Sequence, residues 1–290
     1  MSTNGAVSTP SKGSVYWQEI KQNLKAEWEC FKMPIIWGGI LIGAIFQYLH
    51  NVAHNYVYYL AGVYDVYGGP ENALVDLGFK ALQPSIADLS FLPSNGCLYS
   101  LAAIAVIFAC SPIFTKKLIR IPNLCCIQML WRALVVCSVT IVLRCISFFV
   151  TILPAPAPQC SQADFNPPTT AYEIFTGFDT ENGCSDLIFS SHMMFGITAA
   201  ALVTQYTCVA LGLVADQPLW KHERPLKIAL VVLCWCIVVA EGFCIVAQER
   251  HYTIDVWTAL YAVPLTWLAA FHFFPKDPAP TPKTSDNHIV

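Results

Sequence analysis

Residues 126–153 read CIQMLWRALVVCSVTIVLRCISFFVTIL, a run of 28 residues in which only Arg132 and Arg144 are charged. A helix needs about 20 mostly apolar residues to span the hydrocarbon core of a bilayer. The run is too long for a strand, and it lacks the strict alternation of polar and apolar side chains that a half-buried strand shows. It therefore predicts a membrane-spanning helix.

The composition of the whole chain agrees with a membrane protein. Of its 290 residues, 56% are hydrophobic and only 12% are charged, with a mean hydropathy of +0.52. A soluble domain has about 25% charged residues, and these cover most of its solvated surface. The formal net charge of -3 gives no electrostatic support for binding nucleic acid. Soluble enzymes and nucleic-acid-binding proteins are therefore excluded.

Other apolar stretches meet the same length test, and we expect six spans in all. The predicted spans cover residues 34–49 (with an extension through 51–60), 97–114, 126–153, 187–215, 227–247 and 253–274. The expected fold is an all-α, polytopic membrane protein with six transmembrane helices. Residues 34–274 would form the membrane domain and carry any catalytic site. A cytosolic N-terminal segment (1–33) precedes it, and a Pro-rich cytosolic tail (275–290), expected to be disordered, follows it.

Lysine and arginine gather on one side of the predicted spans. Twelve of the 16 lie in the N-terminal segment, in the second and fourth connections and in the tail. Since basic loops stay in the cytosol, this pattern places both termini there. The odd-numbered connections, including the long one over residues 154–186, would then face a lumen or the exterior.

Two cysteines, Cys160 and Cys184, lie in that long connection, which would sit in an oxidising compartment. We hypothesise a disulfide between them; the alternative is two unpaired thiols at the membrane edge. Most other cysteines lie within apolar runs, where Cys behaves as a small hydrophobe. No spacing typical of a metal site occurs, and we predict neither a metal nor another cofactor.

Ionisable side chains at membrane depth are costly and commonly mark function. In the expected topology His192, His251 and Asp255 all lie near the exoplasmic boundary. His251 and Asp255 are four residues apart on one helix face, so the carboxylate can orient the imidazole, as in a catalytic triad. His192, from another helix, would supply a second proton-transfer group. The plainer interpretation is that each is a polar interfacial anchor; for His50 and His54 we favour such a polar interfacial turn over substrate contact.

Two motifs resemble the paired signatures of the sphingolipid synthase family: Cys184-Ser-Asp186…Ser190-Ser191-His192 and His251-Tyr252-Thr253-Ile254-Asp255. This family comprises sphingomyelin synthases and inositol phosphorylceramide synthases, within the wider lipid phosphate phosphatase group. Two further stretches are similar to the family, Asp76-Leu-Gly-Phe79 and Leu143-Arg144…Thr151-Ile-Leu-Pro154-Ala-Pro156. The residues of the first motif are more similar to those of plant-type inositol phosphorylceramide synthases than to those of animal sphingomyelin synthases. One departure is Ser185, where the family usually has Gly.

The resemblance implies a phosphotransferase that moves the phospho-head group of a glycerophospholipid to the primary hydroxyl of ceramide and releases diacylglycerol. The plant-like residues of the first motif favour phosphoinositol as the head group and phosphatidylinositol as its donor. His251 would hold the head group as a phosphohistidine, Asp255 would orient His251, and His192 would exchange the proton. Its partners would be membrane lipids, with the Golgi as the implied membrane and the active site facing the lumen.

Arg144, Asp186 and Tyr252 are candidates for substrate binding. An arginine near the exoplasmic end of an apolar span calls for an anionic partner. That partner is either a phosphoryl oxygen of the substrate or a carboxylate such as Asp186, and both readings stay open. Arg250 is a further candidate for the phosphoryl group, although snorkelling to the interface explains it as well. Tyr252 also fits an ordinary interfacial aromatic.

Other functions fit parts of the pattern. A sphingomyelin synthase would use phosphatidylcholine, and a related transferase would use diacylglycerol as acceptor. Lipid phosphate phosphatases resemble the chain in the two histidines and the aspartate, but they carry Ser-Arg six residues before the second histidine, where this chain has Ile245. A non-enzymatic lipid transporter is a further alternative, although transporters often show internal repeats and broken helices, and neither is evident.

Overall fold

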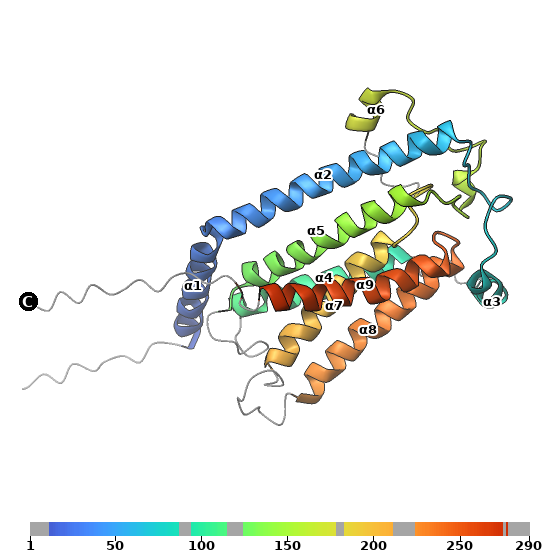
Figure 1. The fold of residues 1–290 in the computed structure, drawn as a ribbon. Coiled ribbons are helices and arrows are strands. Elements are labelled where there is room, and N and C mark those ends of the chain that lie inside the picture. Colours follow the sequence, from blue (N-terminus) through green and yellow to red (C-terminus); the bar gives the residue numbers. More distant parts are fainter. Residues whose placement is uncertain are drawn as a thin grey trace, which may run out of the picture.

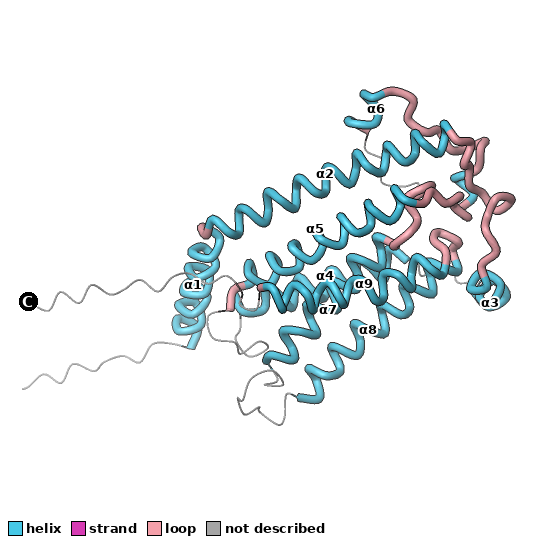
Figure 2. The backbone as a smooth tube through the Cα atoms, in the orientation of Figure 1, coloured by secondary structure: helices cyan, strands magenta, loops and turns pink. Residues whose placement is uncertain are grey.

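The computed structural model describes residues 12–86, 94–114, 124–177, 183–210, 224–274 and 277. In these residues the regular structure is entirely helical (Figure 2). The helices are α1 (Lys12–Phe31), α2 (Pro34–Val63), α3 (Leu77–Ile86), α4 (Ser94–Phe114), α5 (Cys126–Val150), α6 (Ala171–Thr176), α7 (Ser191–Ala210), α8 (Arg224–Ala247) and α9 (Thr253–Phe273), with a short 3-10 turn, η1 (Pro158–Cys160). The prediction of an all-α fold is confirmed for the described residues.

Five of these helices, α2, α4, α5, α8 and α9, are long and apolar enough to cross a membrane. They coincide with five of the predicted spans, which confirms a polytopic membrane protein. The apolar run over residues 126–153 forms α5, which ends at Val150 rather than at residue 153. Because each span needs a long apolar run to satisfy its backbone within lipid, hydropathy alone finds these five helices.

Helix α7 lies inside the bundle and has a different composition. It packs against α4, α5, α8 and α9 (Figure 1). Its buried face includes Met193, Ile197, Ala200 and Val203, all at 0% exposure. A helix enclosed by protein does not need the uniformly apolar surface of a lipid-facing span, and α7 begins with Ser191 and His192. It starts four residues later than the predicted fourth span, whose predicted end at residue 215 lies outside the described residues.

The N-terminal segment contains a helix that the sequence did not predict. Helix α1 turns away from α2 at the end of the bundle where α5 begins (Figure 1). The carboxylate of Glu27 accepts hydrogen bonds from the backbone nitrogens of Cys126 and Ile127, at 2.6 and 3.2 Å. Glu27 thereby satisfies free N–H groups at the start of α5, where the helix dipole favours an anion. The described part of the predicted tail is also held, because Asp277 pairs with Arg132 at 2.7 Å.

The opposite end of the bundle carries most of the described loops. The long helices α2, α5 and α8 end there, and α4, α7 and α9 begin there, close to α3 and η1 (Figures 1 and 2). The chain therefore brings three C-termini and three N-termini of its long helices to one end. The predicted site residues are at this end.

Candidate active site

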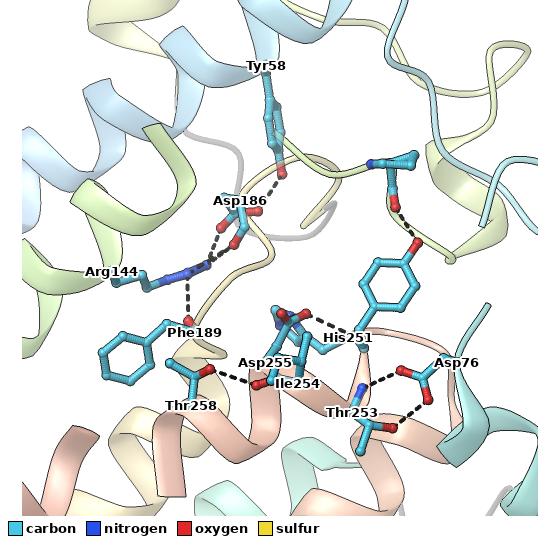
Figure 3. Close-up of polar contacts among 12 residues, drawn as sticks. Tyr58, Asp76, Arg144, Asp186, Phe189, His251, Thr253, Ile254, Asp255 and Thr258 are labelled. Carbon is cyan, nitrogen blue, oxygen red and sulfur yellow. Dashed lines mark hydrogen bonds and ion pairs between the residues drawn. The ribbon is translucent and has the colours of Figure 1, made fainter. Parts of the chain in front are cut away.

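The structure brings together ionisable side chains from α5, from the loop before α7 and from the start of α9. Figure 3 shows Arg144 beside Asp186, with His251 and Asp255 below them on the α9 side. His192 lies in the first turn of α7, and its ring is within electrostatic range of His251, Arg250 and Arg144. All these residues lie at one end of the bundle.

The pairing of His251 with Asp255 is local to the start of α9. The Nδ1 atom of His251 lies 3.4 Å from Oδ2 of Asp255, and both residues are buried. This separation is longer than an ordinary hydrogen bond, as is common for catalytic contacts before substrate binds. Oδ2 of Asp255 also accepts a hydrogen bond from the backbone nitrogen of Tyr252, at 3.0 Å. The bond back to the N-cap residue is one half of a capping box, so the helix start itself holds the carboxylate.

A defined turn presents His251 to the site. The backbone nitrogen of Arg250 donates to the oxygen of Ile245 at 3.1 Å, and that of Glu249 donates to the oxygen of Val246 at 3.0 Å. Glu249 has a φ of 53°. These are the two bonds and the left-handed residue of a Schellman motif, which ends α8. The directions of Arg250 and His251 therefore follow from backbone geometry.

His192 has a partner that the sequence did not reveal. Its Nε2 lies 2.8 Å from Oδ1 of Asn95, at the start of α4. Nη1 of Arg250 donates to the same oxygen at 3.1 Å. Because an amide oxygen only accepts, this arrangement assigns the proton to Nε2 of His192 and leaves Nδ1 without one in the neutral ring. Asn95 belongs to no motif, and a polar residue in the first turn of a span was its one sequence signal.

Arg144 and Asp186 form a buried ion pair. Nη2 of Arg144 donates to the carboxylate of Asp186 and, at 2.8 Å, to its backbone oxygen. Nη1 donates to the backbone oxygen of Phe189 at 3.2 Å. Of the two partners considered for Arg144, the structure contains the carboxylate. A buried arginine needs such pairing, because an uncompensated buried charge is strongly destabilising.

Two side chains of α2 also contact Asp186. Nε2 of His54 lies 3.5 Å from its Oδ2, and the hydroxyl of Tyr58 donates to its Oδ1 at 3.4 Å. Burial on its own would raise the pKa of Asp186, but His54 and Arg144 outweigh burial and lower that pKa to about 2. His54 is therefore part of the polar cluster around Asp186. The sequence predicted only a polar interfacial turn for it.

The loop before α7 is strained and held at several points. Phe189 is buried with a φ of 78°, a conformation that a bulky residue rarely adopts and that commonly occurs at functional sites. The backbone nitrogen of Ser190 donates to the oxygen of Asp255 at 3.4 Å, which links this loop to α9. A disulfide joins Cys160 to Cys184, and the hydroxyl of Tyr58 accepts from the nitrogen of Cys184 at 2.7 Å. The loop is thus fixed by its contacts with α9, with Cys160 and with Tyr58 of α2.

Tyr252 is engaged by backbone groups. Its hydroxyl donates to the oxygen of Pro154 at 2.7 Å and accepts from the nitrogen of Leu74 at 3.0 Å. Its ring stacks on Phe79, with the centroids 5.6 Å apart. The hydroxyl therefore ties two loops to the start of α9, and its predicted contact with substrate stays a prediction.

Comparisons with known proteins point to one family. Residues 183–273 match the family model described as PAP2 superfamily C-terminal. Over 259 residues the chain is 28% identical to phosphatidylinositol:ceramide inositolphosphotransferase 3 of Arabidopsis thaliana, covering 85% of this chain and 79% of that protein. It is 28% identical over 239 residues to the phosphatidylinositol:ceramide inositolphosphotransferase of Oryza sativa subsp. indica, covering 79% of this chain but only 63% of the rice protein. Human phosphatidylcholine:ceramide cholinephosphotransferase 1 is 26% identical over 129 residues, 41% of this chain and 27% of the human protein.

Proposed function

Because the chain belongs to the sphingolipid synthase family, we propose that it transfers phosphoinositol from phosphatidylinositol to the primary hydroxyl of ceramide, releasing diacylglycerol. The inositolphosphotransferases of plants align with most of the chain, whereas the cholinephosphotransferase aligns with less than half of it. This difference favours inositol over choline. The pairing of His251 with Asp255, at the same end as His192, is the observation that carries the chemistry.

In the first half of the reaction, Nε2 of His251 attacks phosphorus and the bond from phosphorus to the diacylglycerol oxygen breaks. Asp255 faces Nδ1 of His251, so it keeps the proton there and stabilises the positive charge that the ring gains. His192 enters this step as the imidazolium and gives its Nδ1 proton to the leaving oxygen. The proton on Nε2 stays on the ring and is hydrogen-bonded to Oδ1 of Asn95.

In the second half, neutral His192 takes the proton of the ceramide hydroxyl at Nδ1. The ceramide oxygen attacks phosphorus, the bond from phosphorus to His251 breaks, and inositol phosphorylceramide leaves. A covalent phosphohistidine divides one difficult transfer into two easier displacements. Both histidines return to their starting forms.

The two arginines have different roles in this proposal. Arg144 is a positioning residue, because its guanidinium holds Asp186 and the strained Phe189 just before His192. Arg250 is half-buried and donates to the Asn95 oxygen that also contacts His192, and its charge there stabilises the phosphoryl oxygens of the transition state. Tyr252 fixes the position of the α9 start through its bonds to Pro154 and Leu74.

We further propose that α7 is a sixth span, with both termini in the cytosol and the site facing the lumen of the Golgi. A 20-residue helix is about 30 Å long, the thickness of the hydrocarbon core. The charge asymmetry of the loops and a disulfide at the end that carries the site both support this orientation. Non-reducing peptide mapping of protein from cells should recover Cys160 and Cys184 as one linked pair; two free thiols would contradict the lumenal placement.

The decisive experiment gives purified protein either phosphatidylinositol or phosphatidylcholine together with labelled ceramide. Labelled inositol phosphorylceramide is the expected product. Sphingomyelin, free head-group phosphate or no product would each reject the proposal in favour of another head group, a hydrolase or a non-enzymatic protein.

A matched pair of variants tests the mechanism. His251→Ala should abolish transfer and the trapping of an acid-labile, phosphate-labelled enzyme. His272→Ala, on the exposed far end of the same helix, should leave both unchanged. Transfer by a folded His251→Ala protein would end the phosphohistidine mechanism.

A further inference from the structure

An apolar groove runs along the lipid-facing side of the bundle, between α2 and α5. Its volume is about 660 Å³, within the range of small-molecule sites. Apart from His50, Tyr56 and Cys145, the side chains that line it consist of hydrocarbon, and none is acidic or basic except His50. Leu49, Ile146 and Phe149 on its walls are all 44–56% exposed. In helices long enough to cross a membrane, such walls open towards the acyl chains of the bilayer.

One end of the groove is roofed by α6, which α2 holds in place. The side-chain amide of Asn55 donates to the backbone oxygens of Ile174 and Gly177, at 3.0 and 2.8 Å. Asn51 donates to Gly177 at 2.8 Å. Because Ile174 and Phe175 of α6 line the groove, these bonds set where it ends. The groove is therefore a built feature of the fold rather than a gap between two helices.

His50 lines this groove and carries a polar atom without a partner in the part of the chain that the structure describes. Nε2 of His50 is buried and has no hydrogen-bond partner among the described residues. A buried polar group without a partner costs free energy, and a ligand that pairs with it recovers that cost. The ring of His50 lies 6.3 Å from the ring of His54, whose Nε2 is 3.5 Å from Asp186. A short line of side chains thus leads from the groove to the polar cluster.

The charges along this line select between the two lipids. Phosphatidylinositol carries an anionic phosphodiester directly beside its chains, and it would need a cation at the mouth of the groove. The groove offers a single imidazole, and beyond it the anionic Asp186 is already paired with Arg144. Ceramide is uncharged and carries an amide and hydroxyls, which suit His50.

We propose that this groove holds a hydrocarbon chain of ceramide, with a polar group of the ceramide head hydrogen-bonded to Nε2 of His50. This inference rests on the proposed transferase function and adds the acceptor subsite to it. The chain enters sideways from the bilayer, and the head then lies on the side of α2 that faces Asp186.

Two valines of α5 provide a matched test. Val142 lines the groove, whereas Val139, one turn earlier, is lipid-exposed and does not. Val142→Trp fills the groove and should lower kcat/KM for a long-chain ceramide on the order of 10-fold relative to Val139→Trp, since losing a few methylene contacts has about this effect. Transfer to N-hexanoyl ceramide and the KM for phosphatidylinositol should stay within about 2-fold. Equal effects of the two substitutions, or a raised KM for phosphatidylinositol alone, would overturn the proposal.

A binding experiment separates this inference from the proposed function. Ceramide with a photoreactive diazirine in its acyl chain should label peptides of α2, α5 or α6 in the wild-type protein, and less so in Val142→Trp. This labelling requires no turnover, so labelling without transfer would reject the function and keep the groove. Labelling elsewhere in the chain, or labelling of these peptides by diazirine phosphatidylinositol instead, would reject the groove as the acceptor subsite.

The contact with the ceramide head has its own test. His50→Phe should lower kcat/KM for ceramide several-fold, the size expected for one hydrogen bond. His50→Gln, which restores a polar atom, should recover part of the loss. Equal rates in the wild type and in His50→Phe would contradict the contact.

Discussion

The carboxylate of Asp76 accepts two hydrogen bonds from Thr253, at 2.7 Å from its backbone nitrogen and at 2.6 Å from its hydroxyl. Asp76 also accepts from the backbone nitrogens of Gly78 and Phe79 at the start of α3. One carboxylate thus caps two helices, and Figure 3 shows its two bonds to Thr253 at the start of α9. A side chain at position 78 would collide with the hydroxyl of Thr253, so glycine allows this close approach. The loop before α3 is therefore tied to the segment that carries His251 and Asp255.

We expect Asp76→Ala to impair transfer by loosening the start of α9. The variant loses the cap of both helices, and the free energy of unfolding should fall by about 1–2 kcal/mol. Transfer should fall on the order of 10-fold, because the start of α9 then holds His251 and Asp255 less firmly. Rates and melting temperatures of the purified variant provide the measurement.

A control and an intermediate variant sharpen this prediction. Asp164→Ala removes an exposed carboxylate from a loop at the same end of the bundle and should leave both quantities unchanged. Thr253→Val keeps the backbone bond to Asp76 and should lie between the wild type and Asp76→Ala. If Asp76→Ala lost stability but kept full transfer, the loop before α3 would stabilise the fold without positioning His251 and Asp255.

The pH dependence of stability should carry the signature of Asp186. Its pKa is lowered from 3.8 to about 2, so the folded state favours the carboxylate and gains stability that is fully present above about pH 4. That gain, about 2 kcal/mol, should disappear as the pH falls from 3.8 to about 2, because protonation then no longer distinguishes the folded from the unfolded chain.

The measurement compares the wild type with Asp186→Asn. The wild type should lose melting temperature relative to the variant as the pH falls through this window, and the difference between them should be constant between pH 5 and 7. A difference that changed around pH 6 instead would assign the effect to the histidines.

The sequence predicted the parts of the molecule that are encoded locally. The spans α2, α4, α5, α8 and α9 are continuous apolar runs, and the pairing of His251 with Asp255 depends only on a spacing of four residues at one helix start. Helix α1 was missed because a mixed polar and apolar helix at the end of a bundle has no strong hydropathy signal. Its position depends on the contact between Glu27 and α5, about 100 residues away.

The remaining site contacts join distant helices. Asn95 and His192 are 97 residues apart, and Tyr58 and Asp186 are 128 residues apart. Such pairs depend on the rotation and the register of each helix against its neighbours, which one sequence does not specify. Arg144 illustrates the difference: its need for an anion was predictable, but the choice of Asp186 required the fold.

Asn95 should control the protonation of His192. In Asn95→Leu the imidazole loses its acceptor, and transfer should fall on the order of 10-fold, with the tautomer no longer set. In Asn95→Asp a carboxylate takes the place of the amide and stabilises the imidazolium form. The pH profile of transfer should then move to higher pH.

The shift in the profile separates a positioning role from simple packing. A merely structural Asn95 would lower the rate in both variants and leave the pH optimum unchanged. Asn72→Leu changes an amide in another loop at the same end of the bundle, whose amide nitrogen donates to Gly68, and should move neither the rate nor the optimum.

A double-mutant cycle on Arg144 and Asp186 should show that Arg144 acts through the loop before α7. Arg144→Gln leaves a buried carboxylate without its cation, and breaking such a pair destabilises a protein by about 3–5 kcal/mol. Adding Asp186→Asn removes the stranded charge, so the double variant should regain much of this stability. Transfer should not recover, because the guanidinium no longer holds the backbone oxygen of Phe189, three residues before His192.

The cycle distinguishes positioning from direct contact with substrate. If Arg144 works only through Asp186 and Phe189, the losses of transfer in the two single variants should not add in the double variant, since both disturb the same loop. If Arg144 also bound the phosphoryl group, Arg144→Gln would raise the KM for phosphatidylinositol independently of residue 186, and the losses would add. Arg250→Gln is the companion variant: it should lower kcat while stability stays within about 0.5 kcal/mol of the wild type, because its half-buried guanidinium is assigned to the transition state rather than to the fold.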